Sequence, residues 1–244
     1  MRRVAPWIIV FAAVAGSAAG VVHLAEAGKG GKAKVKAATK TGAIAGTVTF
    51  DGKPPKPAKL DITDPVCARA GIADETVVVD ARGGVKDAFV SLSGKGLASK
   101  PPSEPVVIDQ RGCMYRPRVT GVVRGQSVQI ENADSTLHNI HAYVGGATEF
   151  NLAQPKGAKP IEKTIEEGNV LELKCDVHPW MRAYAVHVDN AHFAVTADSG
   201  AFEITGVPAG TYTLTAWHPV LGETTAQVKV LKGKTTKVAA TLTK

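Results

Sequence analysis

The stretch VLELKCDVHPWMRAYAVHV, residues 170–188, places a short loop with sulfur and imidazole side chains between two strand patterns. Residues 170–174 and 183–188 are short, mostly apolar and strand-like, and the segment between them predicts a tight loop. Within that loop, Cys175, His178 and Met181 stand three residues apart. Two strands hold such a loop at both ends, so its side chains can wrap one ion. The stretch therefore predicts a metal site built on β-structure.

Similar strand patterns recur along the rest of the chain. Before the loop they cover Ala45–Phe50, Glu75–Asp80, Ala88–Leu92, Pro105–Asp109, Val119–Val123, Ser127–Glu131 and Leu137–Tyr143. Residues 145–168 are polar and contain Pro155, Gly157 and Pro160, which predicts a loop. No helical period appears beyond the N-terminal segment. Short strands at close spacing predict an all-β sandwich or barrel.

The C-terminal stretch has the clearest alternation of apolar and polar residues. Apolar residues alternate in four segments around 202–207, 212–216, 226–230 and 238–242. A unit of four strands, residues 189–244, can hardly bury a core alone. It must pack on the metal domain or borrow strands from residues 44–93.

The donor types in the loop indicate which metal the site would hold. Copper of the blue type takes one thiolate, two imidazoles and a distant thioether. Cys175, His178 and Met181 supply three of these groups, and His138 is the best candidate for the second imidazole. Zinc is the rival, with His141 as a fourth donor. In a regular strand, however, residues 138 and 141 face opposite sides, which disfavours zinc.

The motif as a whole resembles that of the cupredoxins, most closely amicyanin and the plastocyanins. The matching residues are His138-Asn139 and then Cys175-x-x-His178-Pro179-Trp180-Met181-Arg182. The resemblance covers roughly residues 105–188. It implies a Greek-key cupredoxin-like β-sandwich with one type 1 copper held by His138, Cys175, His178 and Met181.

The resemblance also implies roles for the neighbouring residues. Asn139 would hydrogen-bond across the ligand loops and hold them rigid. His178 would be partly exposed, and electrons would pass through it. Pro179 and Trp180 would form an apolar patch beside it, where a redox protein partner docks.

A second resemblance concerns the C-terminal unit. Residues 198–204 and 206–214, DSGAFEI and GVPAGTYTL, are similar to the second half of a carboxypeptidase regulatory-like (transthyretin-like) β-sandwich. Residues 46–54 are similar to its first half. The expected organisation is a cupredoxin-like domain over 44–188 and this small β module over 189–244, completed in one alternative by strands from 44–93.

The N-terminal part reads as an export segment followed by a linker. Arg2 and Arg3 precede an apolar run that ends in a small-residue cleavage site after Ala27, so residues 1–27 predict a signal peptide or, uncleaved, an anchor. Residues 28–43 form a Lys/Gly-rich linker with five lysines, Lys29, Lys32, Lys34, Lys36 and Lys40. These lysines carry most of the formal net charge of +7, so residues 44–244 are nearly neutral and no nucleic-acid partner is expected. We expect a periplasmic or extracellular protein that meets a membrane only through an uncleaved N-terminus.

The chain has three cysteines, Cys67, Cys113 and Cys175. In an oxidising compartment two of them should pair. If Cys175 is a metal ligand, Cys67 and Cys113 are the disulfide candidates. The alternative is that both stay reduced as small buried hydrophobic residues.

Taken together, the sequence predicts an exported mononuclear copper protein that transfers single electrons and is not an enzyme. Two other functions stay open. One is a copper carrier or storage protein, and the other is a metal-free structural β module. Convergence of His138 and Cys175 in space would favour metal binding over the structural role.

Overall fold

The computed structural model describes residues 41–166 and 168–243, which belong to one compact unit and are almost entirely β-structure. The expected all-β fold of β-sandwiches is confirmed. The predicted signal peptide, residues 1–27, and nearly all of the linker, residues 28–43, lie outside the described residues. Among the described residues, no helix is long and apolar enough to cross a membrane.

The central sandwich, residues 106–188, carries the predicted metal loop. Its larger sheet has the order β5-β11-β10-β7-β8, and its smaller sheet has the order β4-β3-β6-β9. Apolar side chains of both sheets, such as Ile108, Ile140 and Leu173, form one buried core. The strands are β3 (Val106–Gln110), β4 (Tyr115–Arg116), β5 (Val119–Val123), β6 (Val128–Asn132), β7 (His138–Val144), β8 (Ala147–Gln154), β9 (Ile161–Lys163), β10 (Val170–Lys174) and β11 (Arg182–Val188).

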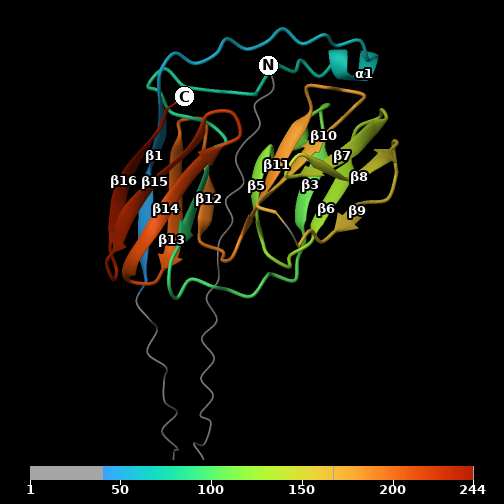
Figure 1. Cartoon of the computed structure of the whole chain (residues 1–244). Coiled ribbons are helices and arrows are strands. Elements are labelled where there is room, and N and C mark those ends of the chain that lie inside the picture. Colours follow the sequence, from blue (N-terminus) through green and yellow to red (C-terminus); the bar gives the residue numbers. More distant parts are fainter. Residues whose placement is uncertain (1–40, 167, 244) are drawn as a thin grey trace, which may run out of the picture. The chain divides into compact units, whose positions relative to one another are not determined.

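The terminal sandwich combines strands from both parts of the chain. Its sheets have the orders β13-β1-β16 and β12-β2-β14-β15, and in Figure 1 the blue β1 lies among the red C-terminal strands. Ile44 and Val48 on β1 are fully buried in a second core with the C-terminal strands. The strands are β1 (Gly42–Asp51), β2 (Phe89–Ser93), β12 (Phe193–Val195), β13 (Ala201–Val207), β14 (Gly210–His218), β15 (Gly222–Val230) and β16 (Thr235–Thr243).

This arrangement is the alternative in which the C-terminal unit borrows strands. β1 pairs antiparallel with β13 and parallel with β16, and β2 pairs with β12 and β14. Residues 42–51 and 89–93 therefore belong to the terminal sandwich rather than to a continuous domain over 44–188. The physical reason is burial, because four C-terminal strands alone would leave their inner face open to water.

Two secondary-structure predictions are wrong. Residues 145–168 contain β8 and β9, although the side chains of β8 are mostly exposed and therefore lack an apolar alternation. Residues 75–80 form no named strand. They contribute an isolated bridge between Val79 and Val85, because Asp80 accepts hydrogen bonds from the backbone of the turn at Arg82 and Gly84.

The short helix α1 (Pro65–Ala68) is not among the elements that the sequence analysis predicts. Asp64 caps it, since its carboxylate accepts hydrogen bonds from the amides of Val66 and Cys67, and Pro65 suits the first helical turn. A disulfide joins Cys67 to Cys113, which lies between β3 and β4. This bond holds α1 against the central sandwich. Figure 1 shows α1 at one end of that sandwich.

Candidate metal site

Three of the predicted donors lie where the strands of the larger central sheet end. His138 opens β7, Cys175 directly follows β10, and His178 lies in the loop before β11. β7 and β10 are antiparallel neighbours, so the start of one and the end of the other meet at the same edge. Two backbone hydrogen bonds close the loop, from the Met181 amide to the His178 carbonyl (2.9 Å) and from the Cys175 amide to the Met181 carbonyl (3.3 Å).

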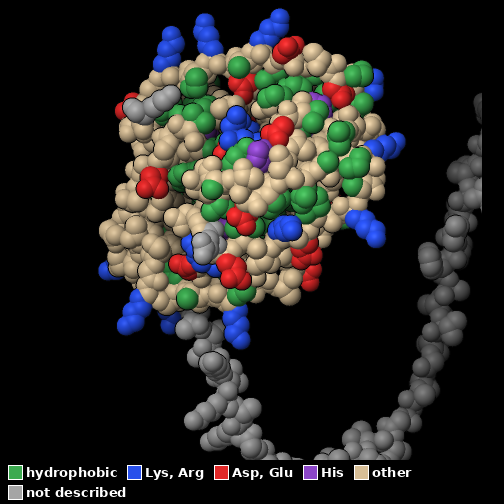
Figure 2. Space-filling model, turned by 45° about the vertical axis from the view of Figure 1, so that its right-hand side comes forward, with side chains coloured by type: hydrophobic (Ala, Val, Ile, Leu, Met, Phe, Trp, Pro, Cys, Tyr) green, Lys and Arg blue, Asp and Glu red, His purple; other side chains and the backbone are tan. Residues whose placement is uncertain are grey.

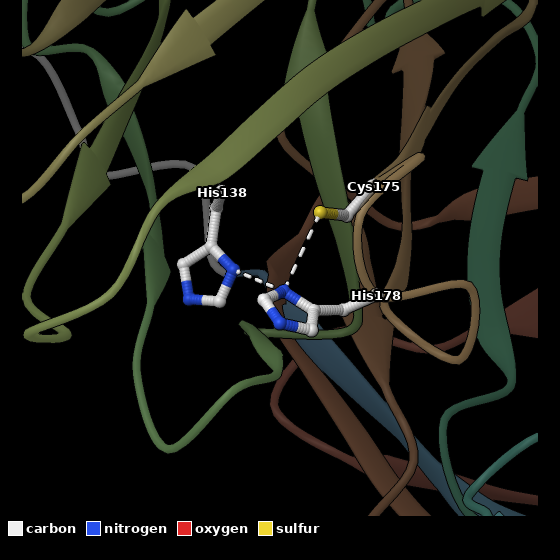
Figure 3. Close-up of side chains that lie close together, drawn as sticks. All are labelled: His138, Cys175 and His178. Atoms are coloured by element: carbon white, nitrogen blue, oxygen red, sulfur yellow. Dashed lines mark hydrogen bonds between the residues drawn. The ribbon is translucent and has the colours of Figure 1, made fainter. Parts of the chain in front are cut away.

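The three side chains point toward one another (Figure 3). Nδ1 of His138 lies 2.9 Å from Nδ1 of His178, and Sγ of Cys175 lies 3.8 Å from the same His178 nitrogen. All three donor atoms lie within 4.8 Å of one another. The residues are at most 2% exposed, so the cluster is shielded from water. Met181 is fully buried in the core cluster that also contains Cys175.

A carboxylate faces the outer nitrogen of each imidazole. Asp134 Oδ2 lies 2.9 Å from Nε2 of His138, and Asp64 Oδ2 lies 3.5 Å from Nε2 of His178. A carboxylate at this position favours the tautomer with the proton on Nε2. Both Nδ1 atoms then turn their lone pairs toward the same point as the sulfur. A cation among these three donor atoms would be stabilised by all of them, so the donor set fits a metal ion.

Neither carboxylate was among the residues predicted from the sequence. Asp134 stands four residues before His138 in a loop, and Asp64 is distant in sequence. The only available signal was the Asp64-Pro65 pair, which is typical of a helix start. That signal indicates the N-cap of a helix. It does not indicate a contact with an imidazole.

Burial and hydrogen bonding shift the pKa values around the site. The hydrogen bond from the Thr136 hydroxyl, together with two helix amides, lowers the pKa of Asp64 to about 2. Burial lowers the pKa of His138 and raises the pKa of the Cys175 thiol. Asp64 therefore stays ionised and His138 stays neutral at neutral pH. A cation bound beside Cys175 would favour the thiolate.

Asn139 links the two ligand-bearing segments, which is the place that the resemblance gives it. Its Oδ1 accepts hydrogen bonds from the amides of Asp176 (2.6 Å) and Val177 (3.4 Å), and its Nδ2 donates to the Asp176 carboxylate (3.0 Å). Its own amide lies 3.5 Å from Sγ of Cys175. One buried side chain thus ties β7 to the metal loop.

His141 points away from the donor cluster, as strand alternation predicts. Its ring interacts with the Asp176 carboxylate (3.0 Å) and the Thr148 hydroxyl (2.9 Å), and it stacks on Tyr143 with ring centroids 4.2 Å apart. The four-donor zinc set that includes His141 is therefore not assembled.

The expectation that His178 is partly exposed is wrong, since the residue is only 2% exposed. Cys67 Sγ lies 3.6 Å from its Nε2, so α1 and the Cys67–Cys113 disulfide cover the edge of the ring. Trp180 is half-buried with its ring 5.3 Å from His178, and its Nε1 donates to the carbonyl of Cys113 (3.0 Å). The surface beside the site is formed instead by Val177 and Pro179, both exposed.

Comparisons with known proteins give one family match and several structural similarities. The model of polysaccharide lyase family 4, domain II, matches residues 166–238, which run from the central into the terminal sandwich. This match does not support the carboxypeptidase regulatory-like assignment of the C-terminal unit. No curated protein matches the chain.

The structural similarities each cover less than half of this chain. A purple cupredoxin from Nitrosopumilus maritimus is 24% identical with a TM-score of 0.31, covering 34% of this chain and 99% of that chain. A mutant of amicyanin in the Cu(I) form is 21% identical with a TM-score of 0.31, covering 41% and 98%. A copper-containing nitrite reductase from Thermus scotoductus is 17% identical with a TM-score of 0.31, covering 41% and 26%. Scores this low do not assign a function, so the case depends on the site itself.

Proposed function

We propose that this chain is a mononuclear type 1 copper protein that transfers single electrons. The observation that carries the proposal is the convergence of the two Nδ1 atoms and the Cys175 sulfur within 4.8 Å in a buried site. One thiolate and two imidazoles form the donor set that blue-copper centres use. Met181, buried next to the loop, is the proposed weak axial donor.

The surrounding residues hold this donor set in place. When bound, copper would supply a one-electron couple between Cu(I) and Cu(II). Asp134 fixes the orientation of the His138 ring, and Asn139 fixes the loop that carries Cys175 and His178. Rigid donors keep the geometry similar in both oxidation states, which lowers the cost of reorganisation during electron transfer.

The burial of the donors favours electron transfer over catalysis. Catalytic metal sites keep a position open for water or substrate. Here the three donor residues are at most 2% exposed, and the packing around them leaves a substrate no direct approach. The same burial disfavours a carrier that must hand its ion to another protein. We therefore propose a redox role and no enzymatic activity.

The proposed partner is a redox protein that docks over the metal loop. Val177 is 50% exposed and Pro179 is exposed, and both flank His178 in the sequence. Trp180 is half-buried and packs near His178. On the face shown in Figure 2, Lys and Arg side chains are interspersed with Asp and Glu. A location outside the cytoplasm follows from the predicted export segment and is part of the proposal.

The first test is a copper titration of residues 28–244, prepared without metal and followed by visible absorption. We expect one equivalent of Cu(II) to give an intense charge-transfer band, and Cys175→Ala to abolish it. A colourless product with correctly folded protein would refute the copper proposal. Tight binding of Zn(II) with no coloured copper form would favour a zinc site instead.

A further inference from the structure

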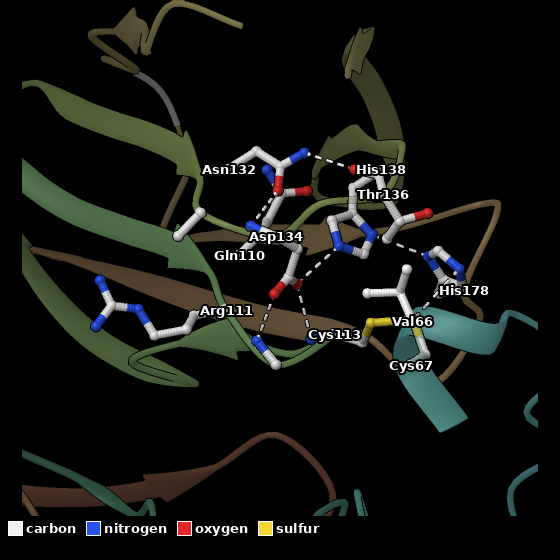
Figure 4. Close-up of polar contacts among 12 residues, drawn as sticks. Val66, Cys67, Gln110, Arg111, Cys113, Asn132, Asp134, Thr136, His138 and His178 are labelled. Atoms are coloured by element: carbon white, nitrogen blue, oxygen red, sulfur yellow. Dashed lines mark hydrogen bonds and ion pairs between the residues drawn. A yellow bond between two sulfur atoms is a disulfide. The ribbon is translucent and has the colours of Figure 1, made fainter. Parts of the chain in front are cut away.

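The segment Asp64–Ala68, called here the cap, covers the outer edge of His178. It consists of α1 and the aspartate that begins it. Figure 4 shows the cap with Cys67 beside the His178 ring. Cys67 Sγ and Asp64 Oδ2 lie 3.6 Å and 3.5 Å from His178 Nε2. The imidazole is therefore enclosed between the metal loop on one side and the cap on the other.

Several bonds anchor Asp64 in this position. The Thr136 hydroxyl donates to Oδ2 (2.7 Å), and the amides of Val66 and Cys67 donate to Oδ1 (2.7 Å and 3.2 Å). Thr136 lies two residues before His138, so the cap is attached to the same segment that presents the second imidazole.

The disulfide extends this anchoring to the other histidine. Cys67 is bonded to Cys113, whose amide donates to Asp134 Oδ2 (2.8 Å). The same Asp134 oxygen lies 2.9 Å from Nε2 of His138. The disulfide thus joins the two cysteines whose amides donate hydrogen bonds to Asp64 and Asp134, the carboxylates that face the two imidazoles (Figure 4).

We propose that Asp64 is a positioning residue and that the disulfide-anchored cap locks His178 in the orientation that presents Nδ1 to the metal. This inference rests on the proposed function, because it names the device that retains the ion. Loss of the ion requires the imidazole to rotate away from it. The space into which the ring would rotate is filled by Cys67 and Asp64, so metal exchange is slow while the cap is in place.

The first experiment measures metal release. Protein loaded with Cu(I) is mixed with an excess of a chromogenic Cu(I) chelator, and the rate of formation of the coloured complex is recorded. Asp64→Asn removes the negative charge beside Nε2. Loss of such an outer partner typically lowers metal affinity about 10- to 100-fold, and we expect this loss as release that is faster by the same factor. Asp61→Asn, a change at an exposed residue three positions before the cap, is the matched control and should leave the rate unchanged.

The disulfide is tested in the same assay with Cys67→Ala/Cys113→Ala. We expect release at least as fast as in Asp64→Asn. If this double variant does not fold, Thr136→Val replaces it, because this change removes the 2.7 Å hydrogen bond to Asp64 and leaves the disulfide intact. Release rates equal to that of the unchanged protein in Asp64→Asn and in Thr136→Val would overturn the proposal.

A second experiment needs no copper. Nitrogen-15 NMR of the metal-free protein reports which ring nitrogen of His178 carries the proton and how fast that proton exchanges with water. We expect the Nε2–H form with slow exchange in the unchanged protein and in Asp61→Asn. Asp64→Asn should lose this preference and exchange faster. The same spectra in Asp64→Asn and the unchanged protein would refute the positioning role.

The two experiments separate the inference from the proposed function. If copper does not bind but the NMR result is as expected, the proposed function fails and the positioning of His178 by Asp64 stands. If copper binds with a charge-transfer band but neither the rate of copper release nor the tautomer of His178 depends on Asp64, the proposed function stands and the cap inference fails.

Discussion

Asp134 makes several contacts at the site besides the one with His138. Its Oδ2 lies 2.9 Å from Nε2 of His138 and accepts from the amide of Cys113, and its Oδ1 accepts from the amide of Gly112 (2.8 Å). One carboxylate therefore orients an imidazole and fixes the turn that carries the disulfide.

Replacement of this carboxylate should weaken metal binding. We expect Asp134→Asn to lower copper affinity by about 10- to 100-fold, because the His138 ring loses the acceptor that fixes its tautomer. Competition with a chelator of known affinity measures the change. Asp198→Asn, at an exposed residue of the terminal sandwich, should have no effect. Unchanged affinity in Asp134→Asn would show that the ring is held by packing alone.

Asn139 provides a second prediction at this scale. We expect Asn139→Ala to destabilise the metal-free protein by about 1–3 kcal/mol, because the buried amides and the carboxylate that it pairs lose their partner. Urea unfolding measures the loss. Asn169→Ala, which removes an exposed hydrogen bond to Arg124, should cost less than about 0.5 kcal/mol. Equal effects of the two substitutions would contradict the prediction.

At the scale of residues, the candidate donors could be predicted from the sequence, but the carboxylates that face their imidazoles could not. Cys175 and His178 stand at a spacing with few other chemical explanations, and His138 was the imidazole on a nearby strand. Asp64 meets His178 because a disulfide holds α1 over the site. This disulfide joins Cys67 and Cys113, which are 46 residues apart in sequence. No local pattern encodes such a contact, so the burial of His178 was not foreseen.

Individual strands were predictable where one face is buried. β5 and β10 have the residue ranges that the sequence predicts, because their apolar residues line the core. β8 was missed because it lies at the edge of its sheet with mostly exposed side chains. Its backbone pairing with β7 follows from hydrogen bonding along the strand and not from side-chain polarity.

The turn between β14 and β15 depends on a neutral histidine. Nδ1 of His218 accepts hydrogen bonds from the amides of Val220 (3.2 Å) and Leu221 (3.3 Å). The residue is 1% exposed, and burial, followed by the charge of Arg118, lowers its pKa to about 4. A protonated ring could not accept these bonds, so the folded state resists protonation.

This histidine predicts a pH dependence of stability. Above the ordinary pKa of about 6.5 the neutral ring is favoured in both states and its contribution is complete. As the pH falls from about 6.5 to 4, the unfolded chain binds the proton and the folded chain does not. The free energy of unfolding should therefore fall by up to about 3 kcal/mol. Urea unfolding at pH 7 and pH 4.5 measures this, and His218→Asn should reduce the difference. An equal pH dependence in both proteins would contradict the prediction.

On the scale of the whole molecule, the terminal sandwich depends on close contact between β1 and its neighbours. A Cβ atom at Gly46 would lie 2.0 Å from the carbonyl oxygen of Val238 on β16 and 3.1 Å from the Phe202 ring on β13. Only glycine allows both strands to approach β1 here.

We therefore expect Gly46→Val to destabilise the terminal sandwich by about 1–3 kcal/mol through overpacking. Trp217 on β14 and Trp180 in the metal loop are the tryptophans of residues 28–244, and each reports on one sandwich. Urea unfolding of variants that keep one tryptophan should show an earlier transition at Trp217. Ala45→Val, on the neighbouring residue that lines an open surface groove, is the control. A shift of the same size at Trp180 would show that the two sandwiches unfold together.

The division of the chain could be predicted only as an alternative. The alternation in residues 202–242 indicated strands, and the shortage of apolar surface indicated that others must join them. The partner of an individual strand cannot be read from its own sequence, because pairing is set by the complete sheet. The resemblance of residues 46–54 to the first half of a β module linked them to the C-terminal unit, but it did not indicate β16 as the partner of β1.

The parallel pairing of β1 with β16 sets an order of events during synthesis. Ala43 pairs with Thr235 and Asp51 with Thr243, so an early strand waits for nearly all of the described chain before its sheet closes. All strands of the central sandwich, by contrast, emerge before residue 189. Contacts so distant in sequence form slowly. The central sandwich can therefore complete its core while β1 is still unpaired, and the terminal sandwich assembles last.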